Sequence, residues 1–220
     1  MISELFQQLM KMWKIVLPIK PQERLEIAIR SGLEEIDLEQ RLLSSAKEGI
    51  TLSEKRLGDY TLSPLKTGGN ANSGFDDYWS KIGETGNTPY LIYLDAPVGF
   101  ALLYKGLPNA LVGVNCPDKN TVMIRQLQGV ISYFINDNHA YKKTSARGLM
   151  PLDWQKLMVD CTVNLAKTAQ FERIGIEGYI HNRWKNLSSF TSSKAKEKYD
   201  GTAERLGFTL KNDQNWYKQL

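Results

Sequence analysis

Three basic residues lie shortly before a predicted helix, where they could bind an anion. Lys142, Lys143 and Arg147 are followed by Gly148, and the helix is predicted to begin within the next few residues. A glycine lets a ligand approach the backbone closely, and the amides of a helix N-terminus attract negative charge. The pattern therefore favours binding of an anionic group. A basic loop that is only solvated surface is the alternative interpretation.

Histidines and cysteines are too few and too scattered to predict a metal site. The two histidines are His139 and His181, and the two cysteines are Cys116 and Cys161. Neither pair has the spacing of a zinc site or of a disulfide framework, so no metal is predicted and the cysteines are expected to be small core residues. The segment TGGNANSG is no phosphate-binding P-loop, because Lys66 precedes the glycines and no buried strand leads into them.

Length and composition are those of a folded, globular protein. The chain has 220 residues, a net charge of +4, 42% hydrophobic residues and 24% charged residues. These values exclude a disordered, fibrous or cysteine-stapled chain, and the charge permits an anionic ligand without requiring one. The N-terminal segment lacks the features of a secretory signal, and no stretch approaches the ~18 apolar residues of a membrane span. We therefore expect a cytoplasmic protein without integral membrane association.

The first 57 residues are predicted to be helical. Apolar residues recur at helical spacing from Ile2 to Leu17, and a second apolar stripe runs from Leu25 to Leu43. The first helix could pack on the rest of the chain, or it could bind a partner or a membrane surface. Residues 1–57 are thus predicted to be an N-terminal helical extension.

Strands and helices alternate from residue 58 onward. In the first part we expect a strand over 59–65, a Gly- and Asn-rich loop, a helix over 75–82, and a hairpin made by 90–95 and 98–106. Strands over 109–117 and 120–130, an insertion at 131–150 and a helix over 153–169 capped by Asp153 follow. The last elements are a strand over 171–180, a helix over 194–206 ending at Gly207, and a final strand. This order predicts an α/β fold, a mixed central sheet flanked by helices, in residues 58–220.

Three segments carry a resemblance to a known family: DAPVGFALLY, WQKLMVDCTVNLAKTAQFERIGIEG and AERLGF. With the element order, they resemble the GNAT superfamily of N-acyltransferases over about residues 58–220. The resemblance implies a GNAT-like fold, acetyl-CoA as co-substrate, and transfer of an acyl group to an amine by direct attack. The acceptor would be a small-molecule or peptide amine, and a homodimer is possible.

The resemblance places the donor's binding residues after the fourth predicted strand. The family's pyrophosphate motif is absent after Val130, so the basic loop before the 153–169 helix would supply the charge. Asn182 stands where family members often place an asparagine that contacts the pantetheine arm. The residues predicted to bind the donor are Gln128, Gly129, Val130, Lys142, Lys143, Arg147, Gly148 and Asn182.

The resemblance also indicates which residues would move protons. Ala203 occupies the position of the family's usual tyrosine acid, and Tyr199 lies one turn earlier on the same predicted helix. No carboxylate lies on the fourth strand, so Glu177 and His181, at the end of the fifth, are the nearest groups that could accept the amine's proton. The predicted catalytic residues are Glu177, His181 and Tyr199. An ordinary edge carboxylate and an ordinary polar histidine are the alternatives.

Two other functions stay open at this point. The missing motif, tyrosine and carboxylate favour a GNAT-like protein that binds a ligand or partner without catalysis. Nucleic-acid binding would use the segments KKTSAR, RWKN and KAKEK, with Trp184 and Tyr199 stacking on bases. Acidic residues interspersed among these basic ones argue against nucleic acid.

Overall fold

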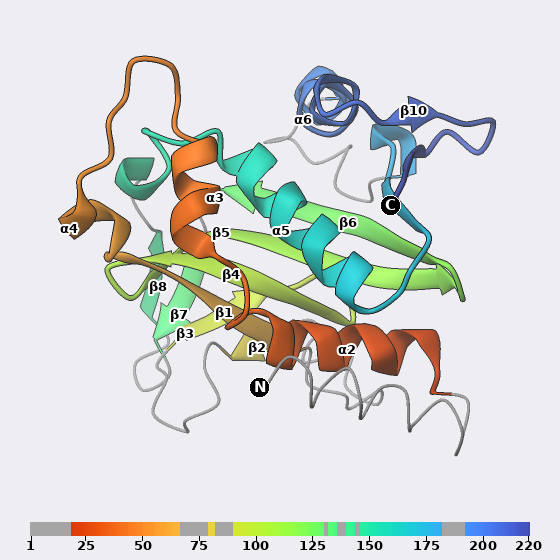
Figure 1. The fold of residues 1–220 in the computed structure, drawn as a ribbon, viewed down its shortest axis with the longest axis horizontal. Helices are drawn as coiled ribbons and strands as arrows, with labels where there is room; N and C mark the ends of the chain where they lie inside the picture. Colours follow the sequence, from red (N-terminus) through yellow and green to blue (C-terminus); the bar gives the residue numbers. More distant parts are fainter. Residues whose placement is uncertain are drawn as a thin grey trace.

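A computed structural model describes residues 19–66, 79–81, 90–129, 132–135, 140–143, 146–181 and 192–220. Within these ranges the chain is an α/β protein whose seven-stranded mixed sheet is flanked by helices (Figure 1). The predicted class, a mixed sheet flanked by helices, is confirmed at this level. The predicted helix over 2–17, Val130, Asn182 and Trp184 lie outside the described residues.

The main sheet has one parallel pair of strands. Its order is β1-β4-β5-β6-β9-β11-β10, and every neighbouring pair is antiparallel except β6 and β9. Helix α5 (Trp154–Thr168) connects these two parallel strands, as a crossover must. The strands are β1 (Tyr60–Lys66), β4 (Val98–Tyr104), β5 (Leu107–Asp118), β6 (Thr121–Gly129), β9 (Arg173–Ile176), β10 (Thr209–Leu210) and β11 (Trp216–Gln219).

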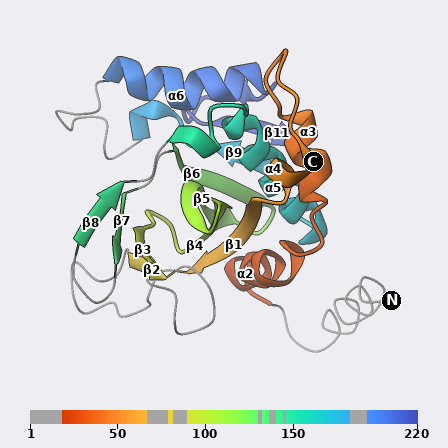
Figure 2. The ribbon, with the colours of Figure 1, turned by 90° about the vertical axis from the view of Figure 1, so that its left-hand side faces the viewer.

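A second sheet stands beside the main one, on the side away from α5 (Figure 2). Its order is β2-β3-β7-β8, all antiparallel. Its strands are β2 (Trp79–Lys81), β3 (Tyr90–Tyr93), β7 (Ser132–Ile135) and β8 (Ala140–Lys143). The central strands of the main sheet are buried on both faces: Phe100 and Leu102 of β4 belong to the core under the helices, Ala101 and Leu103 to the opposite apolar cluster. The continuous apolar run of β4 is what such double burial requires.

Three helices share one core with the sheet. They are α2 (Pro21–Gly32), α3 (Leu38–Ser44) and α5, and both α2 and α3 contact α5. Asp153 caps α5, its carboxylate accepting a hydrogen bond from the Lys156 amide at 3.3 Å. The segment predicted as an N-terminal extension and the alternating segment after it therefore contribute to one hydrophobic core.

The apolar stripe from Leu25 to Leu43 forms two helices, where one was predicted. α2 ends at Gly32, and α3 begins after Asp37, whose carboxylate accepts a hydrogen bond from the Gln40 amide at 2.9 Å. An aspartate cap starts a new helix wherever the chain turns. A four-residue helix, α4 (Glu54–Leu57), follows and leads directly into β1.

The predicted hairpin of 90–95 with 98–106 is wrong. β3 pairs with β2 and β7 in the second sheet, whereas β4 pairs with β1 and β5. Both edges of β4 are thus already used, so β3 cannot join it. The hairpin is formed instead by β4 and β5, through Lys105 (φ 53°) and Gly106 (φ 72°), the left-handed pair of a tight two-residue turn. The described part of the predicted 75–82 helix is strand β2.

The last third of the chain adds a helix and two strands beside β9. The predicted strand over 171–180 is shorter than expected: β9 stops at Ile176, and the 3₁₀ helix η3 (Tyr179–His181) follows. Helix α6 (Ser192–Arg205) ends at Gly207, whose φ of 75° is left-handed, as predicted for a C-terminal glycine. Asp200 of α6 accepts hydrogen bonds from the Tyr179 amide and the Trp216 indole, both at 3.1 Å. These bonds hold α6 against η3 and β11.

Candidate functional site

Strand β6 extends past the point where its parallel partner β9 ends. The ladder joins 121–124 to 173–176, and a hydrogen bond from the Glu177 amide to the Ile124 carbonyl (2.9 Å) closes it. β6 continues to Gly129, and no strand in the described part of the chain pairs with that edge of residues 125–129. An edge of this kind can pair with an extended ligand. We refer to residues 125–129 and 177–181 as the β6–β9 fork.

A β-bulge marks the start of the fork. Val114 of β5 pairs with Ile124 and Gly113 pairs with Gln126, so Arg125 is the extra residue in β6. Bulges redirect side chains, and the Arg125 guanidinium donates a hydrogen bond to Glu177 across the fork at 3.3 Å. Sequence reasoning missed Arg125, although a lone arginine inside the apolar run TVMIRQL was a signal for it.

Glu177 is the residue of the fork whose pKa is shifted by its surroundings. Its side chain is 16% exposed, and burial raises the pKa of its carboxyl above the ordinary value. Arg125 lowers this pKa, Asp95 raises it further, and His181 lowers it. The structure therefore brings together two of the predicted catalytic residues, Glu177 and His181, and adds Arg125 and Asp95 to their surroundings. A carboxylate with a raised pKa is a stronger base than an ordinary one.

His181 is held by the turn between β10 and β11. Its Nε2 lies 2.7 Å from the carbonyl oxygen of Asp213, and because a carbonyl can only accept, Nε2 carries the proton. In a neutral ring with this tautomer, the lone pair is on Nδ1. Tyr217 donates to the Asp213 carboxylate at 2.7 Å, and the Asn215 amide donates to it at 3.1 Å, which fixes the turn. The hydrogen bond from Tyr217 lowers the pKa of Asp213.

Gln126, Gln128 and Gly129 have structural partners. Gln126 is buried; its carbonyl oxygen accepts from the Asp95 amide at 2.6 Å, and its amide group donates to the Tyr93 carbonyl at 3.3 Å and to Gln128 at 3.1 Å. These bonds fasten the segment after β3 onto β6. A Cβ at Gly129 would lie 2.9 Å from the Trp154 ring, so this glycine lets α5 approach the strand end. All three residues belong to the segment 125–129, the β6 side of the fork.

Tyr199 is only 4% exposed and lies in the main core among apolar side chains. Helix α6, on which Tyr199 lies, contacts η3, on which His181 lies. Its neighbour Lys198 lies over the Tyr199 ring at 5.8 Å, and burial lowers the pKa of Lys198 to about 8. Sequence reasoning did not single out Lys198, because a lysine in KAKEK resembles any solvated lysine.

The predicted phosphate-binding residues do not form one site at α5. A Cβ at Gly148 would lie 2.7 Å from Asn109 and 2.8 Å from Tyr104, so its backbone is packed against the β4–β5 hairpin. At the start of α5, the Asp153 carboxylate already caps the helix and pairs with Arg205. A pyrophosphate there would meet the Asp153 carboxylate. Lys142 and Lys143 lie on β8 in the second sheet.

The chain matches no known protein family, no curated protein and no solved structure. Within the described residues, no three His, Cys, Asp or Glu side chains gather as a metal would require. No helix in the same ranges is long and apolar enough to cross a membrane. The arrangement of residues at the fork therefore carries the functional argument.

Proposed function

We propose that this protein is a GNAT-like acyltransferase that transfers an acyl group from acetyl-CoA, or a related thioester, to an amine at the β6–β9 fork. One observation carries the proposal: the parallel strand pair that the described residues form in the main sheet stops at Ile124 and Ile176, with the half-buried Glu177 directly after it. The strand order of the main sheet is compatible with a GNAT-like fold. The acceptor would be a small-molecule or peptide amine. The homodimer and the cytoplasmic location stay predictions.

The fork suits the amide-containing arm of acetyl-CoA, whereas the start of α5 does not suit its phosphates. The unpaired edge of residues 125–129 suits an extended, amide-containing arm, because such an arm can hydrogen-bond along a strand edge. The start of α5 does not suit the donor's phosphates, since Asp153 and Arg205 occupy it. The proposal therefore assigns the thioester to the fork and assigns no role to α5's N-terminus.

Acyl transfer forms a C–N bond, breaks the C–S bond and removes a proton from the attacking nitrogen. The Glu177 carboxylate can accept this proton, directly or through water, and Nδ1 of His181 is the second acceptor. A protonated His181 can return the proton to the leaving sulfur. Backbone amides on the open edge of 125–129 can donate to the oxygen on which negative charge develops.

Binding without catalysis is the second candidate, because Arg125 already holds the Glu177 carboxylate at 3.3 Å. An assay of thiol release from acetyl-CoA with a panel of amines separates the two. We expect amine-dependent release, and a loss of roughly 100-fold or more in Glu177→Gln, the usual cost of removing a general base. Glu172→Gln, an exposed carboxylate just before the other end of β9, is the matched control and should keep full activity.

Three outcomes are informative. Thiol release that is insensitive to Glu177→Gln would remove the base assignment. Binding of acetyl-CoA by calorimetry, without release in the presence of any amine, would favour the binding protein. Absence of acetyl-CoA binding would overturn both versions.

A further inference from the structure

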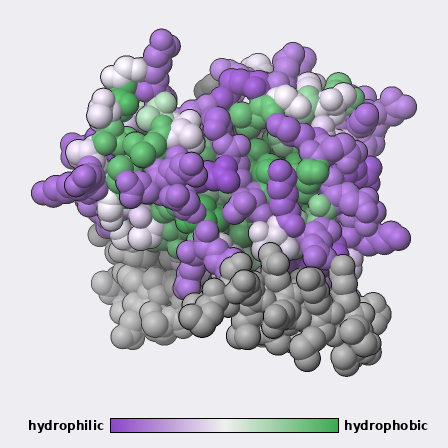
Figure 3. All heavy atoms as spheres, in the orientation of Figure 1, coloured by the Kyte–Doolittle hydropathy of each residue, from purple (hydrophilic) through white to green (hydrophobic). Residues whose placement is uncertain are grey.

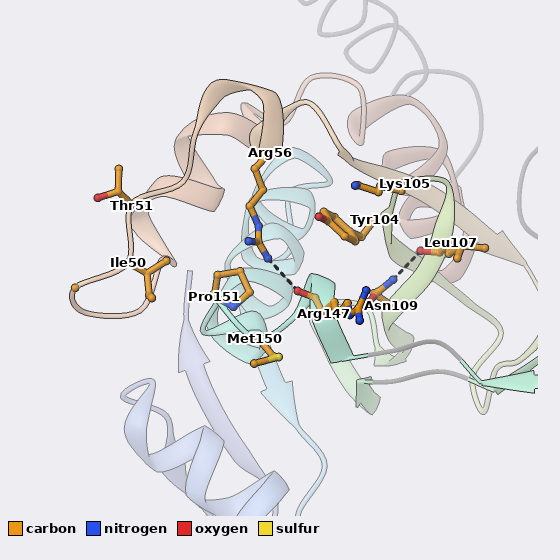
Figure 4. A pocket seen from close by; sticks show the side chains of 11 residues that line it. Ile50, Thr51, Arg56, Tyr104, Lys105, Leu107, Asn109, Arg147, Met150 and Pro151 are labelled. Atoms are coloured by element: carbon orange, nitrogen blue, oxygen red, sulfur yellow. Dashed lines mark hydrogen bonds between the residues drawn. The ribbon is translucent and has the colours of Figure 1, made fainter.

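A pocket of about 800 Å³ is lined by the β4–β5 hairpin and by segments that are not part of the fork (Figure 4). Four segments distant in sequence form it: the loop after α3, helix α4, the β4–β5 hairpin, and the 3₁₀ helix η2 (Ala146–Gly148) with the residues that follow. This volume is in the range of small-molecule sites. The lining residues are Gly49, Ile50, Thr51, Arg56, Tyr104, Lys105, Leu107, Asn109, Arg147, Met150 and Pro151.

The charge of the lining has one sign. Arg56, Lys105 and Arg147 are cationic, and none of the described lining residues is acidic. Arg56 donates to the Arg147 carbonyl at 3.0 Å and lies 5.8 Å from the centre of the Tyr104 ring, which fixes its guanidinium in the wall. Beside the lining, the Asp59 carboxylate lies 3.7 Å from the Lys105 ammonium. Converging cations from three elements are the arrangement that binds phosphate groups.

Two buried polar atoms in the wall have no partner among the described residues. Asn109 is 3% exposed; its amide group donates to the Leu107 carbonyl at 3.0 Å, but its Oδ1 accepts no hydrogen bond. Nε of Arg56 is also buried and unpaired. Unsatisfied buried groups are rare because each costs free energy. Protein atoms cover both of them, with Asn109 packed against Gly148, so they belong to the wall behind the pocket surface.

The rim of the same pocket is apolar. Met150 is 66% exposed, Ile50 45% and Leu107 38%, and these three are half of the large hydrophobic side chains exposed in the described residues. Figure 3 shows apolar surface next to the segment that joins α3 to α4. A rim of this kind gains free energy when it covers the apolar part of a ligand.

We propose that this pocket binds a small phosphorylated molecule, with the phosphate between Arg56, Lys105 and Arg147 and an apolar portion against Ile50, Leu107 and Met150. The site is independent of the proposed acyl transfer, since it shares no residue with the fork. Arg147 was predicted to bind an anion, and its partners come from α4 and from the hairpin, 91 and 42 positions earlier in the chain.

Isothermal calorimetry with inorganic phosphate, ADP and n-hexyl phosphate tests the proposal. n-Hexyl phosphate should bind about tenfold more tightly than inorganic phosphate, because two covered CH₂ groups provide roughly that factor. Lys105→Gln and Arg147→Gln should each weaken binding of n-hexyl phosphate by about tenfold or more. Asp59→Asn should strengthen it, since the carboxylate no longer competes for Lys105.

Lys55→Gln is the matched control: it removes the same charge from α4 outside the pocket, and it should leave affinity unchanged. Circular dichroism of each variant verifies folding. Equal weakening by Lys55→Gln would show a diffuse charge effect and overturn the proposal. Absence of binding of all three phosphates at millimolar concentration would overturn it too. So would binding only to vesicles that contain phosphatidic acid, which would indicate a membrane surface instead.

Discussion

The two sides of strand β6 carry opposite chemistry. On the β9 side, a half-buried carboxylate with a raised pKa faces Arg125 and His181. On the β5 side, three cations line a pocket that has no acidic residue among those described. Between them, Gly129 at the strand end packs against Leu149 and Trp154. One strand and the start of one helix thus separate a site suited to proton transfer from a site suited to phosphate.

This difference shows why the net charge of +4 has little meaning by itself. The fork pairs a carboxylate with an arginine, whereas the charged residues that line the pocket are all cationic, and the sum over the chain conceals this difference. Residues predicted to form one donor site are divided between the two: Gln128 belongs to the fork, and Arg147 lines the pocket. Each site can therefore be disabled without the other.

The largest expected effect is a crossed loss of function. Glu177→Gln should lower amine-dependent thiol release roughly 100-fold and leave n-hexyl phosphate affinity unchanged. Lys105→Gln should lower that affinity about tenfold and leave thiol release unchanged. Enzyme kinetics measure thiol release, and calorimetry measures n-hexyl phosphate affinity, in both variants. If either substitution reduced both readouts, the two sides would be one site, and the comparison would fail.

An intermediate effect is expected at Gly148, which belongs to the pocket side alone. Gly148→Ala should lower the free energy of unfolding by about 1–3 kcal/mol, because the new Cβ would overlap Asn109 and Tyr104. Urea unfolding measures this change. Gly201→Ala in α6 is the control: no atom lies near its added Cβ, and alanine favours a helix, so a gain of about 0.5–1 kcal/mol is expected. An unchanged stability in Gly148→Ala would mean that the pocket wall is loosely packed.

The smallest expected effect is a pH dependence that only the fork side should show. The folded-state pKa of Glu177 is raised, so the folded chain binds this proton more tightly than the unfolded chain. Its contribution to stability is present below the ordinary glutamate pKa and is lost as pH rises through the raised value. Relative to Glu177→Gln, the native protein should lose stability over this window.

Urea unfolding of both proteins at several pH values measures this slope, with Glu172→Gln as the control that should run parallel to the native protein. A native protein that gained stability against Glu177→Gln over the same window would show that Arg125, rather than burial, dominates the pKa of Glu177.

Local patterns predicted several elements well. Helix α5 was predicted over 153–169 and is found at Trp154–Thr168, because its apolar stripe and its Asp153 cap both lie within the segment itself. The left-handed Gly207 after α6 was predicted for the same reason. Glu177 and His181 were brought together as expected, since only four positions and one turn separate them.

Predictions that depended on distant partners were less successful. The 90–95 segment was predicted to pair with its neighbour, but β4 pairs with β1 and β5 and leaves no edge for it. At the start of α5, the predicted cap Asp153 also pairs with Arg205, which is 52 positions away. The local sequence of neither segment indicates which distant residues it contacts in the folded chain.

The sequence by itself therefore determined the spacing of apolar residues in helices and strands, the helix caps and the turns, because backbone preferences and side-chain spacing act within a few residues. Only the tertiary structure decided which charges face each other: Arg125 with Glu177, and Arg56 with Arg147 and Lys105. These groups are 42 to 91 positions apart in the chain, and the energy of their interactions depends on burial and geometry that exist only after the chain has folded.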